Sequence, residues 1–228
     1  MIIKGLQKLT LIDYPDTVAC TIFTFGCNLR CPYCHNPELV VDDGRENIDV
    51  EEIFHFLEER KDFLDGVCVT GGEPTLHQDL PEFLSKIKQM GFLIKLDTNG
   101  TNPEMIDRLI KNKLIDYIAM DIKSPLERYE DVCKSKVDLD SIKKSVEMIK
   151  NSGIDYEFRM TVPPQTFEEK DFVSISEWLK GSKKFYLQQF KGIKTLDKSF
   201  IGKESVSLEQ LNQFYNILKP SFQICGIR

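Results

Sequence analysis

The segment Cys27-Asn28-Leu29-Arg30-Cys31-Pro32-Tyr33-Cys34 places three thiols at the spacing C-x₃-C-x₂-C, directly after the apolar run from Val18 to Phe25. No fourth cysteine follows close by. A closed structural zinc site needs four ligands, and an iron–sulfur cluster usually takes four cysteines. A metal centre held by these three cysteines therefore leaves one position for another ligand.

The composition is that of a globular enzyme, with 228 residues, 29% charged and 41% hydrophobic. Because 36 acidic residues outnumber 30 basic ones, we expect neither nucleic acid nor an anionic membrane as a partner. No run approaches the ~18 apolar residues of a membrane span. Seven cysteines, three of them close together, indicate a metal site in a reducing compartment, so we expect a cytoplasmic protein.

Strand-like runs alternate with amphipathic helical patterns along the whole chain. This alternation predicts one α/β domain over residues 1–228 with parallel strands. The six predicted strands are Val18–Phe25, Val67–Thr70, Phe92–Leu96, Tyr117–Ile122, Tyr156–Val162 and Lys184–Phe190. The patterns between and after them predict helices near residues 50–57, 80–87, 103–110, 139–149, 172–179 and 208–218, with Asp79, Asn102 and Ser207 as helix caps.

Polar residues recur at every second position on three of these strands. Parallel strands covered on both faces are apolar throughout, so this alternation favours a full or partial barrel with a polar interior over an open sheet. The residues concerned are Lys95 and Asp97, Asp121 and Lys123, and Glu157, Arg159 and Thr161.

The segments at the strand ends carry the candidate binding residues. In parallel α/β folds sites assemble at the carboxyl ends of the strands, so we expect the cysteine segment to face Gly71-Gly72-Glu73-Pro74, Asp97-Thr98-Asn99-Gly100 and Asp121-Ile122-Lys123. The glycines permit close approach of a ligand, Glu73 could accept from an ammonium, and Lys123 could pair with a carboxylate. An amino acid moiety carries both charges and could also fill the vacant metal position.

These motifs resemble the radical S-adenosylmethionine (SAM) superfamily. The opening L-I-D-Y-P-D at residues 11–16, followed by F-G-C-N-L-R-C-P-Y-C-H-N, resembles the activating enzymes of glycyl radical enzymes. Among these it is most similar to activators of anaerobic ribonucleoside-triphosphate reductase. The resemblance extends from Leu11 to about Gln189 and implies a partial (β/α)6 TIM-like barrel of parallel strands, the radical SAM fold.

The resemblance implies two cofactors. A [4Fe-4S] cluster would be held by Cys27, Cys31 and Cys34, and the amine and carboxylate of S-adenosylmethionine would chelate its fourth iron. One electron from the reduced cluster would then yield methionine and a 5′-deoxyadenosyl radical, which abstracts a hydrogen atom. No side chain is expected to act as a catalyst beyond these ligands, and His35, His55 and His77 offer little general-base capacity.

The same matching implies roles for the residues around S-adenosylmethionine. Tyr33 would lie by the adenine, Gly71, Gly72 and Glu73 by the methionyl amine, and Lys123 by the carboxylate. Asp97, Thr98 and Asp121 stand where related activases place a monovalent cation. Gln189 lies in the region where pyruvate formate-lyase activase-like enzymes are expected to have a histidine. Arg159 is a candidate from the strand alternation alone.

The resemblance implies a glycyl radical enzyme as the protein substrate and reduced flavodoxin or ferredoxin as the electron donor. Two other readings remain open. The radical chemistry could act on a small molecule, a peptide or a tRNA base. Alternatively, the cysteines could form a non-catalytic iron–sulfur or zinc module, although this leaves Glu73 and Lys123 without a role.

Overall fold

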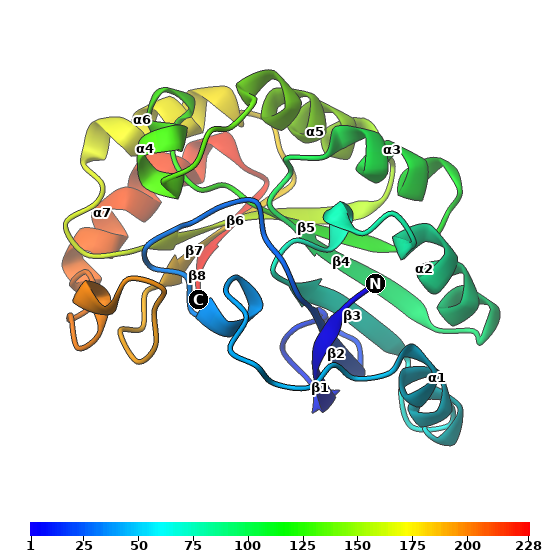
Figure 1. Cartoon of the computed structure of the whole chain (residues 1–228). Coiled ribbons are helices and arrows are strands. Elements are labelled where there is room, and N and C mark those ends of the chain that lie inside the picture. Colours follow the sequence, from blue (N-terminus) through cyan, green and yellow to red (C-terminus); the bar gives the residue numbers. More distant parts are fainter. The chain divides into compact units, whose positions relative to one another are not determined.

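The computed structural model describes residues 1–228 and divides into two compact units (Figure 1). The first unit comprises residues 1–28, 38–98 and 102–119, and the second comprises residues 29–37, 99–101 and 120–228. The predicted single domain over residues 1–228 stays a prediction.

The strands of the first unit are mainly parallel. β1 (Ile3–Thr10) runs antiparallel to β2 (Ala19–Thr24), and β2, β3 (Gly66–Gly71) and β4 (Leu93–Thr98) follow one another in parallel. β5 (Tyr117–Asp121) begins in this unit, and its last two residues belong to the second. The chain therefore returns to the same end of the sheet after each parallel strand, which requires a crossover segment.

Three helices provide the crossovers of the first unit, namely α1 (Val50–Glu59), α2 (Leu80–Gln89) and α3 (Pro103–Lys111). Asn102 caps α3 as predicted, because its side-chain oxygen accepts from the N–H of Met105 (3.2 Å). Asp79 is the N-cap residue of α2 as predicted, but its side chain accepts from no N–H of the helix and pairs instead with the N-terminal amine of Met1.

The second unit repeats the same arrangement. β6 (Asp155–Val162), β7 (Lys184–Gln189) and β8 (Ile224–Ile227) are parallel, with Arg159 beside Tyr186 and Tyr186 beside Gly226. Its helices are α4 (Tyr129–Cys133), α5 (Leu139–Asn151), α6 (Glu169–Trp178) and α7 (Leu208–Leu218). Ser207 caps α7 by accepting from the N–H of Gln210 (3.1 Å).

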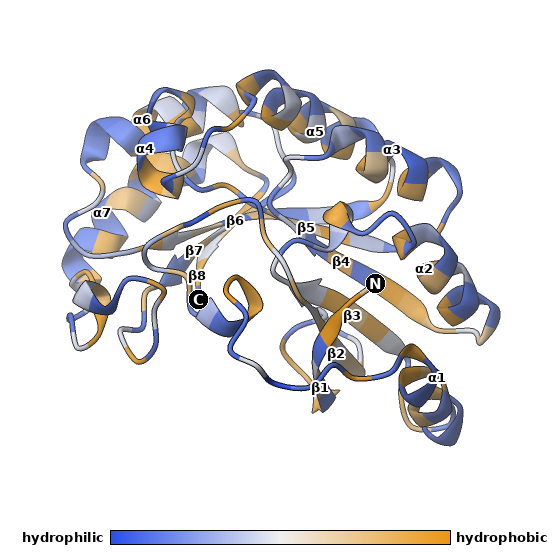
Figure 2. Cartoon of the chain, viewed as in Figure 1, coloured by the Kyte–Doolittle hydropathy of each residue, from blue (hydrophilic) through white to orange (hydrophobic).

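Each unit has its own hydrophobic core. In the first unit Ile22, Val69 and Leu96 are fully buried on neighbouring strands. In the second, Phe172 of α6 stacks on Phe214 of α7 with 4.0 Å between ring centroids. Figure 2 shows hydrophobic residues alternating with hydrophilic ones along the helices, which is the amphipathic pattern that predicted them.

All six predicted strands form, and β1 and β8 are additional. β1 escapes a pattern-based prediction because it contains Gly5 and the exposed run Gln7-Lys8-Leu9, and β8 because it has only four residues. No helix combines the length and hydrophobicity that crossing a bilayer would require.

Candidate functional site

The cysteine loop, residues 27–34, follows β2 and contributes Cys27 to the first unit and Cys31 and Cys34 to the second. The N–H of Cys34 donates to the carbonyl of Cys31 (3.0 Å), so these two cysteines stand at the ends of one tight turn. Cys31 is buried and the other two are half-buried. None of the seven cysteines forms a disulfide.

The glycine pair after β3 packs against the chain that leads into Cys27. A Cβ on Gly71 would lie 2.3 Å from the carbonyl oxygen of Thr24, and one on Gly72 only 2.0 Å from that of Gly26. The N–H of Gly72 donates to Thr24 (2.9 Å). The sequence analysis explains these glycines by the close approach of a ligand. The structure gives a different reason, because a side chain at either position would clash with the backbone of Thr24 or Gly26. Their contact with a cofactor stays a prediction.

Glu73 lies directly beyond the glycine pair and is fully buried. Its Oε1 accepts from the N–H of Thr75 (3.1 Å), the hydroxyl of Thr75 (2.5 Å) and the hydroxyl of Thr98 (2.7 Å). Its own N–H donates to the carbonyl of Gly26 (2.7 Å). A buried carboxylate is costly without such partners. These bonds fix its position and bring together Thr98, at the end of β4, and Glu73.

Lys95 and Asp97 form a buried ion pair on one face of β4. Their side chains are 1% and 11% exposed, and Nζ of Lys95 also lies 3.8 Å from the sulfur of Cys68. The resemblance implied a monovalent cation near Asp97. In this structure a lysine already supplies positive charge to that carboxylate.

In the second unit Asp121, Lys123 and Arg159 form a charge cluster. Oδ2 of Asp121 lies 3.0 Å from Nζ of Lys123, and Oδ1 accepts from Nε of Arg159. Burial opposes the charge of Asp121, but Arg159 and Lys123 outweigh it and hold the pKa of this carboxyl well below its usual range. Burial also opposes the charge of Lys123, and Asp121 raises its pKa well above the usual range.

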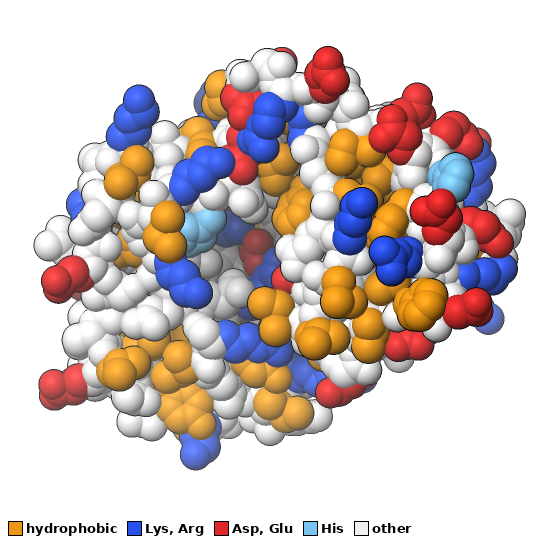
Figure 3. Space-filling model, turned by 90° about the horizontal axis from the view of Figure 1, so that it is seen from below, with side chains coloured by type: hydrophobic (Ala, Val, Ile, Leu, Met, Phe, Trp, Pro, Cys, Tyr) orange, Lys and Arg blue, Asp and Glu red, His pale blue; other side chains and the backbone are white.

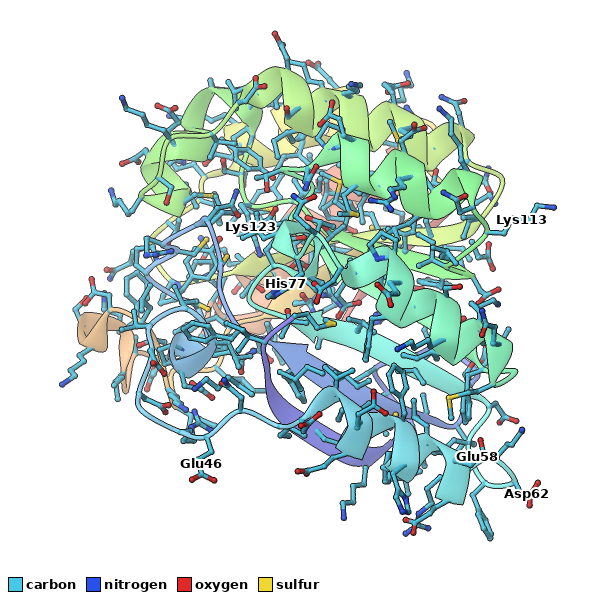
Figure 4. The ribbon with its side chains drawn as sticks, turned by 45° about the vertical axis from the view of Figure 1, so that its right-hand side comes forward. Glu46, Glu58, Asp62, His77, Lys113 and Lys123 are labelled. Carbon is cyan, nitrogen blue, oxygen red and sulfur yellow. The ribbon has the colours of Figure 1, made fainter.

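This cluster carries two positive charges and one negative charge, so it retains a net positive charge at neutral pH. It therefore suits an anionic group such as a carboxylate. Lys123 lies two residues beyond the end of β5 and is labelled in Figure 4. Both carboxylates implied as cation ligands, Asp97 and Asp121, are thus paired with basic side chains.

Cys31 lies within the influence of this cluster. A hydrogen bond with the side chain of Cys133 is the largest effect on its thiol; burial opposes it, Lys123 adds to it, and together they lower the pKa of Cys31 to about 7. Tyr33 is buried, and burial together with the charge of Cys31 raises its pKa well above the usual range. The cysteine turn thus offers one acidic thiol beside a neutral phenol.

Cys133, to which the sequence analysis assigns no role, lies in contact with Cys31. It is fully buried at the end of α4, and its carbonyl accepts from the N–H of Arg30 (3.0 Å). Tyr129, Val132 and Cys133 are apolar at i, i+3 and i+4, a signal for one helical turn that could have placed it. The hydroxyl of Tyr129 accepts from the N–H of Lys123 (3.2 Å), so α4 contacts both the charge cluster and the cysteine turn.

His77 is a second residue whose position the sequence did not predict. Its Nε2 lies 3.0 Å from the carbonyl oxygen of Phe25, two residues before Cys27, so the neutral ring donates a hydrogen bond there. Burial lowers its pKa, although the bond to Phe25 opposes the shift. Figure 4 labels His77 in the segment after β3. No spacing rule links it to Phe25, so only the fold could reveal the contact.

Two predicted positions at the later strands behave differently. Arg159 of β6 reaches Asp121, as described above. Gln189 ends β7, where its N–H donates to the carbonyl of Arg228 (2.9 Å). On the same face of β6 as Arg159, the buried Glu157 is paired with the guanidinium of Arg228 at 2.9 and 3.1 Å, an ion pair that the sequence did not predict.

The donor set fits an iron–sulfur cluster. Thiolates are the cluster ligands of proteins, and the cysteine loop supplies three thiols outside any disulfide, one of them with its pKa lowered to about 7. Within either unit no three Cys, His, Asp or Glu side chains surround a position where they could hold a metal ion. This holds for a zinc ion and for an iron–sulfur cluster alike.

The chain matches the family model of the Radical SAM superfamily over residues 21–175. It also resembles the crystal structure of Streptococcus suis SuiB bound to S-adenosylmethionine, with a TM-score of 0.69 and 15% sequence identity, over 89% of this chain and 48% of SuiB. The chain thus corresponds to about half the length of that protein. These matches confirm the predicted parallel-strand α/β fold of the partial-barrel type, and the [4Fe-4S] cluster and S-adenosylmethionine are the cofactors of this family.

Two curated relatives narrow the family. The chain is 38% identical over 206 residues to a protein of Methanocaldococcus jannaschii named as a glycyl-radical enzyme activating enzyme, which covers 87% of this chain and 84% of that one. It is 30% identical over 179 residues to the pyruvate formate-lyase-activating enzyme of Clostridium pasteurianum, over 74% and 71% of the two chains. The chain is therefore an oxidoreductase-type enzyme of the radical SAM superfamily and belongs to its glycyl-radical enzyme activating enzymes.

Proposed function

We propose that this enzyme generates a glycyl radical on anaerobic ribonucleoside-triphosphate reductase. The family acts on protein substrates, and the choice of reductase rests on the resemblance of residues 11–36 to its activators. The observation that carries the chemistry is the acidic Cys31 thiol beside the net positive cluster of Asp121, Lys123 and Arg159. The second unit therefore supplies both a thiolate that can bind a metal and a positive charge that can bind the carboxylate of a ligand.

The proposed assignment of residues follows the sequence prediction. Cys27, Cys31 and Cys34 hold the cluster, Glu73 accepts from the methionyl ammonium, and Lys123 pairs with the methionyl carboxylate. Further proposed contacts to S-adenosylmethionine come from Tyr33, Gly71, Gly72, Arg159 and Gln189. A monovalent cation at Asp97, Thr98 and Asp121 is the least supported part, because it would compete with Lys95, Lys123 and Arg159 for the carboxylates.

When bound, the cluster and S-adenosylmethionine supply the one-electron cleavage that produces a 5′-deoxyadenosyl radical. The chain itself needs no acid or base for this reaction. Its residues orient the cofactor: the hydrogen bonds from Thr75 and Thr98 fix the carboxylate of Glu73, and Asp121 holds Lys123 by an ion pair. Such fixed charges position a ligand without reorganisation when it binds.

The test is made under anaerobic conditions with the reconstituted protein. Addition of dithionite and S-adenosylmethionine should give 5′-deoxyadenosine, detected by chromatography. Addition of the reductase from the same cell should then give the doublet of a glycyl radical by electron paramagnetic resonance. A cluster-loaded sample that makes no 5′-deoxyadenosine would contradict radical chemistry. 5′-Deoxyadenosine without a glycyl doublet on any glycyl radical enzyme of that cell would favour a small molecule, a peptide or a tRNA base as substrate.

One observation supports a second candidate function, a structural zinc module. Cys133 contacts Cys31, so a fourth thiol lies near the cysteine loop, and four thiolates are a typical structural zinc site. Metal analysis of the protein as isolated separates the two: stoichiometric zinc that resists replacement by iron would support the structural module.

A further inference from the structure

One segment outside the proposed site is bonded directly to the cysteine loop. We name residues 191–203, which follow β7, the lysine segment. The N–H of Leu196 donates to the carbonyl of Cys34 (3.0 Å), and the N–H of Asp197 donates to that of Pro32 (2.9 Å). The side chain of His35 bonds to the backbone of Lys194, and its ring lies 5.3 Å from that of Phe190. The segment therefore covers the turn that carries Cys31 and Cys34.

The lysine segment is basic in an acidic chain. It contains four lysines and one aspartate, a net charge of +3, whereas the whole chain carries −6. All four lysines are exposed: Lys191, Lys194, Lys198 and Lys203. The one acidic side chain, Asp197, accepts from the N–H of Ser199 within the segment (2.9 Å). A local positive field against a negative background steers an acidic partner to this place.

Exposed apolar side chains lie among these lysines. Ile193 is 82% exposed and Ile201 49% exposed. Nζ of Lys203 lies 4.3 Å from the ring centroid of Phe200. Figure 1 draws the segment in orange, and Figure 3 shows basic side chains interspersed with hydrophobic ones on the face seen from below. Protein interfaces combine exposed apolar side chains with charged ones.

We propose that the lysine segment is the docking surface for an acidic one-electron carrier protein, of the flavodoxin or ferredoxin class, that reduces the cluster. The proposal rests on the function proposed above, because it requires a cluster at the cysteine loop. Electron transfer slows steeply with distance, so a carrier must dock where the chain separating it from the cluster is thin. The segment meets this condition, since its backbone bonds directly to Pro32 and Cys34.

Charge favours a carrier over other occupants. Interfaces of electron carriers are small, and they depend on long-range attraction for their rate of association. Three net positive charges within thirteen residues supply that attraction, and two exposed isoleucines supply a modest apolar contact. Association through such a surface weakens as salt screens the charges.

The experiment compares two reductants on the cluster-loaded enzyme. The variant carries Lys191→Glu, Lys194→Glu and Lys198→Glu, and the readout is the rate of 5′-deoxyadenosine formation with dithionite or with reduced flavodoxin. The matched control carries Lys61→Glu, Lys111→Glu and Lys113→Glu, which change the net charge equally. The control lysines are exposed and belong to the first unit, and Figure 4 shows Lys113 pointing away from the protein.

We expect the flavodoxin-driven rate of the lysine-segment variant to fall at least tenfold at low salt. Its dithionite-driven rate and iron content should match those of the control, and added salt should slow the wild type toward the variant. Equal flavodoxin-driven rates in variant and control would overturn the proposal. So would a loss with both reductants at unchanged iron content, because the segment would then act on the cysteine loop itself.

Two further outcomes separate this proposal from others. Should the triple variant fail to load iron, the single variant Lys191→Glu takes its place with an expected loss of about threefold, because Lys191 is exposed and adjacent to neither Leu196 nor Asp197. Normal reduction by flavodoxin together with loss of the glycyl doublet would mean that the segment binds the glycyl radical enzyme, and the proposal would be wrong. Absence of 5′-deoxyadenosine from the wild type with dithionite would contradict the proposed function instead.

Discussion

Among single residues, substitutions of Cys31 and Cys133 would show which thiols bind the metal centre. They contact each other, yet only Cys31 belongs to the C-x₃-C-x₂-C pattern. Replacing Cys31 by Ala removes a proposed ligand, so we expect the iron content after reconstitution to fall to background. Cys133→Ala should keep iron near the wild-type level, as should Cys20→Ala and Cys68→Ala, because these thiols are buried among apolar strands.

Iron and zinc contents by metal analysis check this prediction. Cys133→Ser serves as the control for loss of packing, since it keeps a small polar group at the end of α4. A Cys133→Ala protein that loses its metal while Cys133→Ser also loses it would identify Cys133 as a fourth ligand and would contradict the open cluster position.

Lys123 tests the recognition of the cofactor carboxylate. Its Nζ lies 3.0 Å from Asp121, and its charge is favoured by that partner. Hydrogen bonds to charged groups contribute about 1.5–3 kcal/mol, so Lys123→Ala should weaken S-adenosylmethionine binding by roughly tenfold or more. Equilibrium binding to the cluster-loaded protein measures this. Iron content should not change; a variant that loses iron would show that Lys123 is structural. Lys123→Arg, which keeps the charge, should bind with a smaller loss.

At the scale of elements, the turn after β3 acts as a support for the cysteine loop. Gly72 packs on Gly26, Glu73 bonds to the same carbonyl, and His77 bonds to Phe25. Three contacts from one segment thus fix the two residues that precede Cys27. Any change that displaces this turn is therefore expected to displace Cys27.

Gly72→Ala is the direct test of that support. Its Cβ would lie 2.0 Å from the carbonyl oxygen of Gly26, a clash of backbone with side chain that cannot relax by rotation. Overpacking costs typically 1–3 kcal/mol, so we expect a loss of about that size in unfolding free energy together with reduced iron content. Gly91→Ala is the control, because its Cβ meets nothing within 4 Å and only its positive φ costs energy. Denaturant unfolding and iron analysis check both, and a Gly72→Ala protein as stable as the wild type would contradict the packing argument.

At the scale of the whole molecule, the strands were predictable because burial imposes a pattern. Val67, Val69, Ile94 and Leu96 are apolar because they are buried, and each predicted strand contains such a run. The polar positions on every second residue led to Arg159, which does reach Asp121. The fold class and the types of residue in the candidate site were thus accessible from local pattern.

The contacts that join distant segments were not accessible in this way. Nothing in spacing links His77 to Phe25, Cys133 to Cys31 or Arg228 to Glu157, which lies 71 residues earlier. Such pairs depend on the crossover geometry of the strands and on which loops fold back. The role of Gly71 and Gly72 in backbone packing was not accessible either. A glycine required by a ligand and one required by backbone packing look the same in a sequence.

His77 also affects the response of the whole molecule to pH. Burial lowers its pKa below the ordinary value of 6.5, so the unfolded chain binds a proton at higher pH than the folded chain does. The stabilising contribution of the neutral ring is therefore fully present above about pH 6.5 and is lost as the pH falls toward the folded pKa.

His77→Gln keeps a donor toward the carbonyl of Phe25 and cannot titrate. We expect its unfolding free energy to fall less than that of the wild type between pH 7.5 and 5.5, measured by urea denaturation of the apoprotein. His55→Gln, at a side chain that is 75% exposed, should follow the wild type. Parallel pH curves for wild type and His77→Gln would mean that the fold does not hold the ring neutral, and the prediction would be wrong.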